Sequence, residues 1–162
     1  MAAIAGGRED PRRRFAESLL EAIPGDAPIL IYSSYESGVI TELEEAFPDL
    51  APVLIRLRSR MRDLLPVVRD NIAHPKFFGS YSIKVVAPIL APELQYDDLV
   101  VTDGTAASAA FYRLATGKYA TGESPQSLMK ALEEYCAKDT LAMVLVHRAL
   151  RRAGAVQGVV GI

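Results

Sequence analysis

The sequence predicts an α/β fold with an incomplete sheet and a predominantly helical remainder. Residues 27–34, APILIYSS, form a continuous apolar run rich in isoleucine, which is typical of a buried strand. A second strand is only weakly indicated, in residues 62–71, where Pro66 permits an edge or end position. Two strands alone make a marginal sheet, and a strand this apolar is normally covered on both faces. We therefore expect one partial domain over residues 1–162 whose opening strands are missing.

Helical patterns surround this strand in the first half of the chain. Asp10-Pro11 is a suitable N-cap and first-position pair, and Pro24-Gly25 ends the apolar face that follows it. Two more helices are expected after the strand, at residues 37–46 and from about residue 50 to 61.

The second half is expected to be helical throughout, apart from its connectors. Ser82 is expected to cap a short helix, and Asp103 lies in a turn or near the start of the next one. The expected segments are a loop at 74–82, a helix at 83–90, a loop or extended piece at 96–104, a helix at 105–116, a polar connector at 117–127, and a final helix that ends at Gly154.

Composition and charge exclude several classes of protein. The formal net charge of −2 gives no global basic signature, so binding of nucleic acid through overall charge is not indicated. The single cysteine, Cys136, excludes an internal disulfide, and no Cys/His cluster has zinc spacing. Cys136 is expected to be a buried, inert thiol. No segment reads as a signal peptide or a membrane span, so we expect a cytoplasmic protein without a membrane partner.

The final helix carries the first pair of residues suited to chemistry. Tyr135 and Asp139 are four residues apart and therefore share a helical face. A carboxylate there could hold a divalent metal while the phenol orients a water or a phosphate oxygen. Alternatively, Tyr135 marks a helix boundary and Asp139 a solvated edge. The apolar residues around Asp139 favour the first interpretation, because a buried acid needs a partner or a metal.

A second acid follows the predicted strand. Glu36 comes after Tyr35 at a strand-to-helix junction, and ligands in α/β sheets bind at the carboxyl ends of strands. The alternative is that Glu36 merely favours the positive end of the helix that begins there. Asp63 reads as a lone structural acid at an element boundary.

Residues 74–84 combine cations, hydroxyls and aromatic rings. This combination suits a phosphate backbone and stacked bases, although a loop with a capped helix and packed rings has the same composition. The expected nucleic-acid-binding residues are His74, Lys76, Ser80, Ser82 and Lys84, together with Tyr35.

Together these segments resemble a known bacterial family. The strings APILIYSSYES, GSYSIK and YCAKDT, within residues 10–150, are similar to domain of unknown function 2779. That domain resembles the ribonuclease H-like, proofreading-type 3'–5' exonucleases, which use four acids and a tyrosine. The resemblance implies a metal-dependent phosphodiesterase that acts on single-stranded nucleic acid, DNA or RNA.

The resemblance also assigns the site residues. Tyr135 and Asp139 match the last motif of the superfamily, and Tyr35 with Glu36 matches the middle one. Glu36 and Asp139 would hold Mg²⁺ or Mn²⁺, and Tyr135 would position the nucleophile. Ser80, Ser82 and Lys84 match a serine and lysine that open a helix beside the site.

The first motif, an aspartate and a glutamate separated by one residue, has no counterpart before residue 8. The chain therefore resembles the C-terminal portion of the domain, and its metal would be weakly held and its activity absent or impaired. A noncatalytic module that binds nucleic acid or protein is the alternative. A homo-oligomer or an upstream domain is expected to cover the exposed sheet edge.

Overall fold

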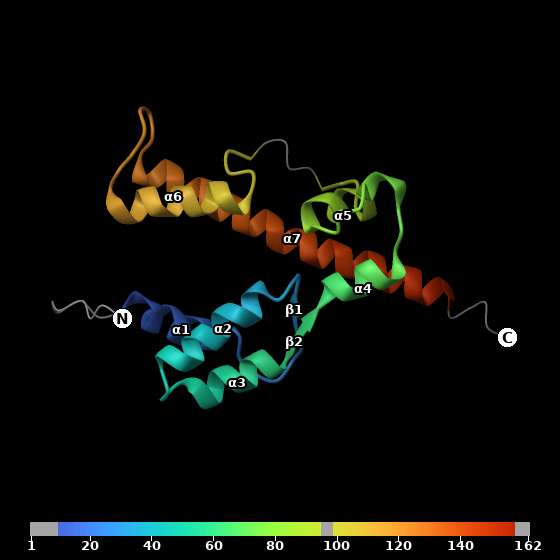
Figure 1. Cartoon of the computed structure of the whole chain (residues 1–162), viewed down its shortest axis with the longest axis horizontal. Coiled ribbons are helices and arrows are strands. Elements are labelled where there is room, and N and C mark those ends of the chain that lie inside the picture. Colours follow the sequence, from blue (N-terminus) through green and yellow to red (C-terminus); the bar gives the residue numbers. More distant parts are fainter. Residues whose placement is uncertain (1–9, 95–98, 158–162) are drawn as a thin grey trace. The chain divides into compact units, whose positions relative to one another are not determined.

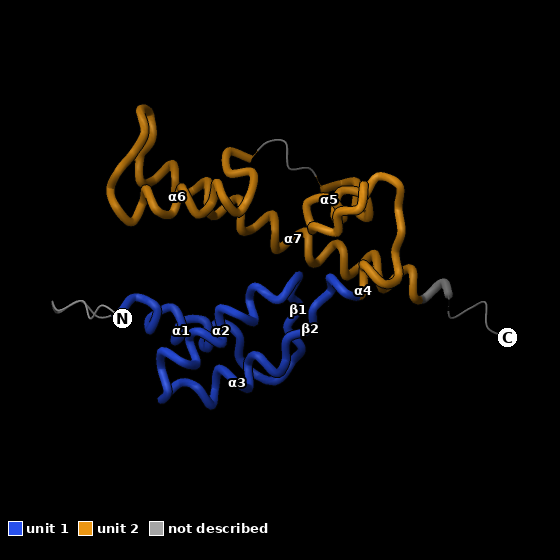
Figure 2. Tube along the Cα trace, viewed as in Figure 1, with its two compact units in different colours: residues 1–66 blue, residues 67–162 orange. Residues whose placement is uncertain are grey.

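The computed structural model describes residues 10–94 and 99–157, and it divides into two compact units, residues 1–66 and 67–162 (Figure 2). Each unit is described by itself. In chain order the elements are α1 (Pro11–Ala22), β1 (Ile29–Ile31), α2 (Tyr35–Ala46), α3 (Ala51–Ser59), β2 (Met61–Asp63), α4 (Leu64–Asn71), the 3₁₀ turn η1 (Pro75–Phe77), α5 (Ile83–Leu90), α6 (Gly104–Thr116) and α7 (Pro125–Gln157).

Unit 1 contains a parallel pair of short strands. Ile29 pairs with Met61 and Ile31 with Asp63, and α2 and α3 form the crossover between the two strands (Figure 1). The expected strand in residues 27–34 is confirmed at its centre. The suggestion of a strand over residues 62–71 is wrong for most of its length, because the backbone is helical from Leu64 onward. Pro66 lies in the first turn of that helix, where its missing N–H breaks no hydrogen bond.

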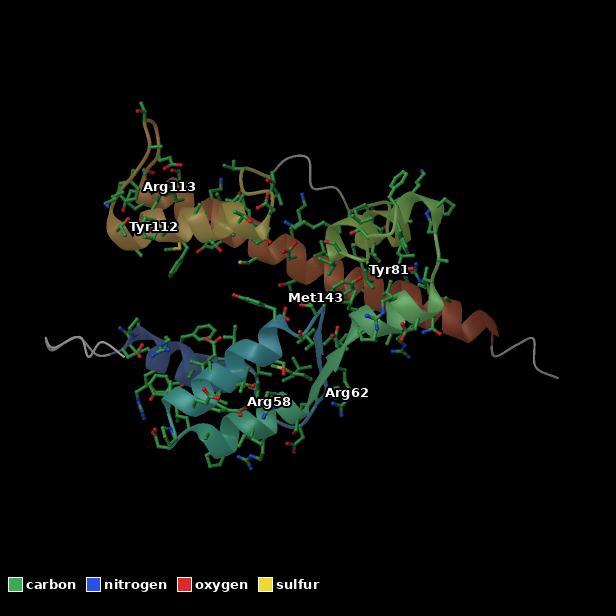
Figure 3. The ribbon with its side chains drawn as sticks, in the orientation of Figure 1. Arg58, Arg62, Tyr81, Tyr112, Arg113 and Met143 are labelled. Carbon is green, nitrogen blue, oxygen red and sulfur yellow. The ribbon has the colours of Figure 1, made fainter. Side chains whose placement is uncertain are left out.

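Helices α1, α2 and α3 enclose the core of unit 1. Asp10 caps α1 by accepting a hydrogen bond from the backbone N–H of Arg12, as its position before Pro11 predicts. Arg58, labelled in Figure 3, reaches from α3 to α2 and forms an ion pair with Glu44 at 2.7 Å. The buried side chains are Ala16, Ile40, Leu43, Phe47, Leu54 and Leu57.

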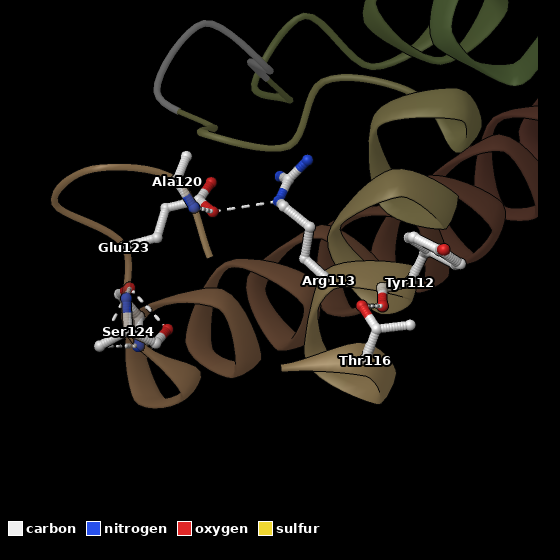
Figure 4. Close-up of polar contacts among 7 residues, drawn as sticks. Tyr112, Arg113, Thr116, Ala120, Glu123 and Ser124 are labelled. Atoms are coloured by element: carbon white, nitrogen blue, oxygen red, sulfur yellow. Dashed lines mark hydrogen bonds and ion pairs between the residues drawn. The ribbon is translucent and has the colours of Figure 1, made fainter. Parts of the chain in front are cut away.

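In unit 2, α5 and α6 pack against the long helix α7 (Figure 1). Asp103 caps α6 by accepting from the N–H of Ala106 at 2.8 Å, and Gly117, with φ +68°, ends it. In the connector to α7, Glu123 accepts from the N–H of Ala120 and forms an ion pair with Arg113 (Figure 4). The core beneath α6 consists of Val101, Ala110, Leu128 and Ala131.

Three expectations for the second half need correction. The final helix does not end at Gly154 but continues to Gln157. Cys136 is exposed rather than buried. Ser82 stands at the N-cap position of α5, but its side chain makes no capping hydrogen bond. Part of the piece expected at 96–104, residues 96–98, lies outside the described residues.

None of the helices in the described part of the chain combines the length and the apolar character that a membrane span requires.

We expect Leu54→Ala to lower the free energy of unfolding by about 2–5 kcal/mol, because the side chain is fully buried and its loss leaves a cavity. Ile55→Ala is the control, since Ile55 is about half exposed on the same helix and its truncation should have a small effect. Urea denaturation followed by circular dichroism measures both. Equal losses for the two variants would contradict the described packing of α3.

Candidate functional site

The carboxyl ends of the two strands of unit 1 are tied together by one carboxylate. Oδ1 of Asp63 accepts hydrogen bonds from the backbone N–H of Ser33, at 2.9 Å, and of Leu65, at 2.8 Å. Ser33 has φ +106°, a conformation that side-chain-bearing residues rarely adopt. Such strain persists only where surrounding contacts enforce it, and here the hydrogen bond that the Ser33 N–H donates to Asp63 is one of them.

Glu36 lies in the first turn of α2, directly after this junction. Its side chain is half-buried, and its Oε2 atom is buried without a hydrogen-bond partner among the described residues. Burial raises the pKa of Glu36 above its ordinary value, and the negative charge of Asp63 raises it further. A hydrogen bond from the backbone N–H of Glu36 lowers this pKa but does not offset the two effects that raise it.

Asp63 is the site residue that sequence reasoning missed. It is structural, as expected from the sequence, but its charge also acts on Glu36 and on Tyr32. Burial above all, and then Asp63, raises the pKa of Tyr32 to about 12. The signal that could have found Asp63 is topological. If 29–31 and 61–63 pair in parallel, the residues that end both strands must meet at one edge.

Tyr135 and Asp139 form the counterpart in unit 2. Both are half-buried on consecutive turns of α7, as their spacing predicts. Burial is the main cause that raises the pKa of Tyr135, followed by the interaction of its hydroxyl with the Asp139 carboxylate. Oδ1 of Asp139 is buried and has no hydrogen-bond partner in the part of the chain that the structure describes. This helix therefore presents a protonated phenol beside an incompletely paired carboxylate.

Lys84 joins this pair from α5. Its Nζ lies 4.4 Å from the centroid of the Tyr135 ring, and it donates a hydrogen bond to the carbonyl oxygen of Thr102. Among the residues expected to bind nucleic acid, Lys84 is therefore the one that the structure places beside Tyr135.

The remaining residues of that group are exposed. His74, Lys76, Ser80 and Ser82 line the turn around η1, where His74 Nδ1 accepts from the N–H of Lys76. Phe77 is buried and contacts the rings of His74 and Tyr81, so part of the aromatic content is packing. Phe78 is 91% exposed and adopts a left-handed conformation, with φ +49°. Tyr35, in unit 1, is 76% exposed.

The predicted site thus falls into two parts. Glu36 and Tyr35 belong to unit 1, and the other predicted residues belong to unit 2. That the carboxylates of Glu36 and Asp139 approach within reach of a shared metal stays a prediction. Within residues 10–94 and 99–157, no cluster of three or more His, Cys, Asp or Glu side chains could hold an ion. Taken separately, Glu36 and Asp139 each have one buried carboxylate oxygen without a hydrogen-bond partner among the described residues, and carboxylate oxygen is a ligand type that hard divalent cations take.

Comparison with known proteins concerns mainly the residues of unit 1. Residues 3–82 match the domain of unknown function DUF2779. The DUF2779 segment contains the strand pair, Glu36, Asp63 and the exposed turn as far as Ser82, whereas Lys84, Tyr135 and Asp139 lie beyond it. The expected resemblance over residues 10–150 is thus confirmed for its first half. No curated protein and no solved structure matches the chain.

We expect Glu36→Gln to raise the melting temperature at neutral pH in metal-free buffer. Because burial raises the folded-state pKa of Glu36, the folded protein binds this proton more tightly than the unfolded chain does. The stability that Glu36 contributes is full below its ordinary pKa of 4.5 and is lost as the pH rises through the folded-state value. The increase in melting temperature that Glu36→Gln causes should therefore grow as the pH rises from 4.5 through the folded-state pKa.

Glu45→Gln is the matched control, since Glu45 is exposed on the same helix. Thermal unfolding between pH 4 and pH 8 gives the comparison. A Glu36→Gln variant that is less stable than the parent at pH 7 would contradict the burial argument.

Proposed function

We propose that this chain is a metal-dependent nuclease domain, a 3'–5' exonuclease-like phosphodiesterase that acts on single-stranded DNA or RNA. The observation that supports it is the pair of buried carboxylate oxygens without hydrogen-bond partners, one on Glu36 and one on Asp139. A buried anionic oxygen in a folded protein normally has a partner, and a divalent cation supplies one. The DUF2779 match and the parallel strand pair are compatible with a ribonuclease H-like fold, which we propose with it.

Each residue has a definite role under this proposal. Glu36 and Asp139 would hold Mg²⁺ or Mn²⁺, which on binding neutralises charge on the phosphate and activates water. Tyr135 is protonated at neutral pH, and its raised pKa keeps it so at higher pH, so its hydroxyl can donate a hydrogen bond to a water or a phosphate oxygen. Two carboxylates match the charge of one divalent ion but cannot offset the charges of the two ions that a two-metal site holds, so we propose weak metal binding and low activity.

We also propose a partner for the sheet edge and a cellular compartment. Each described strand is paired on one side only, which favours a second copy or an upstream domain as the partner of the sheet edge. With one cysteine and no internal disulfide, the proposed compartment is the cytoplasm.

We expect Asp139→Asn to slow the Mn²⁺-dependent shortening of a fluorescently labelled single-stranded oligonucleotide. Loss of one electrostatic group at a reacting centre lowers the rate on the order of a hundredfold. Glu133→Gln, exposed on the same helix, should retain the parent rate. Calorimetric titration with Mn²⁺ provides a reading where turnover is below detection. Full activity in Asp139→Asn, or a parent chain that neither binds Mn²⁺ nor shortens the oligonucleotide, would overturn the proposal.

A noncatalytic binding module is the second candidate, and Phe78 favours it. An aromatic ring that is 91% exposed, two residues from an exposed lysine, is a platform on which a base can stack. This role needs neither carboxylate.

For this function we expect Phe78→Ser and Lys76→Ala each to weaken binding of a single-stranded oligonucleotide, by about tenfold for the lost stacking. Fluorescence anisotropy at two salt concentrations measures it, and the lysine variant should show the smaller salt dependence. Phe111→Ser removes a ring that is 66% exposed on α6 and is the control. Binding that is unchanged in both variants, or lost equally in the control, would exclude the turn as the binding surface.

A further inference from the structure

Lys84 is engaged within unit 2 on several sides. Its ammonium lies over the face of the Tyr135 ring and donates to the carbonyl oxygen of Thr102. Its charge also acts on the carboxylate of Asp103, the cap of α6. Lys84 thus connects α5, the start of α6 and α7 through one side chain.

This environment differs from that of Lys76. Lys76 is exposed, whereas Lys84 is half-buried and directed at an aromatic ring of its own unit. A lysine is a flexible side chain, so ordering it in one conformation requires contacts that offset the lost freedom. The contacts to Thr102 and Tyr135 provide them, and they fix the ammonium relative to the ring.

We propose that Lys84 is a positioning residue, which holds the Tyr135 ring so that its hydroxyl stays beside Asp139. The meaning of this role for catalysis rests on the proposed nuclease function, but the positioning itself does not. Helix α7 fixes the spacing of Tyr135 and Asp139 along its axis, while the orientation of the ring depends on what contacts its face. The two lysines then have separate tasks: Lys76 meets the ligand, and Lys84 orients the tyrosine.

Nuclear magnetic resonance of the full chain tests the positioning without any need for activity. With ring-¹³C tyrosine, and with Tyr135→Phe to assign the signal, we expect Lys84→Met to shift the Tyr135 ring resonances and Lys84→Arg to restore them largely. Lys130→Met is the control, because Lys130 is exposed on α7 and pairs with Glu134. An unshifted Tyr135 signal in Lys84→Met would overturn the proposal.

A reciprocal measurement guards against a Lys84 variant that does not fold. In the parent chain the ε-CH₂ protons of Lys84 should resonate upfield, because the ammonium nitrogen bonded to that carbon lies over the ring, and Tyr135→Leu should abolish this displacement. Ordinary lysine shifts in the parent chain would contradict the contact directly.

The activity measurements separate this proposal from the nuclease proposal. On the single-stranded oligonucleotide with Mn²⁺, Lys84→Met should lower kcat about tenfold to a hundredfold, the range expected of a misplaced group, with KM unchanged. Lys76→Ala should raise KM with kcat unchanged. A raised KM with an unchanged kcat in Lys84→Met would instead make Lys84 a ligand-binding residue and overturn its positioning role. If the parent chain neither binds Mn²⁺ nor turns over, the nuclease proposal fails while the spectroscopic result still decides the role of Lys84.

Discussion

The Asp63 carboxylate is the interaction on which the architecture of unit 1 depends. One oxygen accepts from Ser33 at the end of β1 and from Leu65 at the start of α4, while Asp63 itself ends β2. A parallel pair of three-residue strands has few ladder hydrogen bonds, so this link adds substantially to what joins the strand ends. It also stabilises the positive φ of Ser33, which turns the chain from β1 into α2 and sets the position of Glu36.

The same construction explains why Glu36 stands out from the other acids. Elsewhere in unit 1, the largely buried carboxylate of Glu44 pairs with Arg58, and the exposed carboxylate of Asp49 pairs with Arg13. Glu36 instead has Asp63, a second negative charge, as a neighbour. Such an arrangement lowers stability, because two negative charges lie close together without a cationic partner for Glu36 among the described residues. Asp139 in unit 2 repeats the pattern with a buried, unpaired oxygen.

Sequence patterns predicted the local features well and the long-range ones poorly. Asp10 was recognisable as a cap, and Asp103 was expected in a turn or near a helix start, because capping depends on the adjacent residues alone. The apolar strand and the shared face of Tyr135 and Asp139 follow from period and spacing. Asp63 looked isolated because its partner Ser33 is thirty residues away and the link runs to a backbone N–H, which leaves no trace in side-chain types. The prediction of a strand around Pro66 was wrong. The strand ends at Asp63, and Pro66 lies in the first turn of the helix that follows, where a proline is tolerated.

Lys84 links two short sequence segments, residues 79–84 and residues 135–139, at the ring of Tyr135. Residues 135–139 are one turn of helix, so the distance between the phenol and the carboxylate along α7 needs no support from elsewhere. Rotation of the tyrosine ring is a separate freedom, which the packing around the ring and the cation at its face restrict. In unit 2 the cation over that ring comes from residues 79–84, GSYSIK, through Lys84. Of the residues in this segment, Lys84 is thus the one with a contact to Tyr135 that explains its place, while binding of nucleic acid by Ser80 and Ser82 stays a prediction.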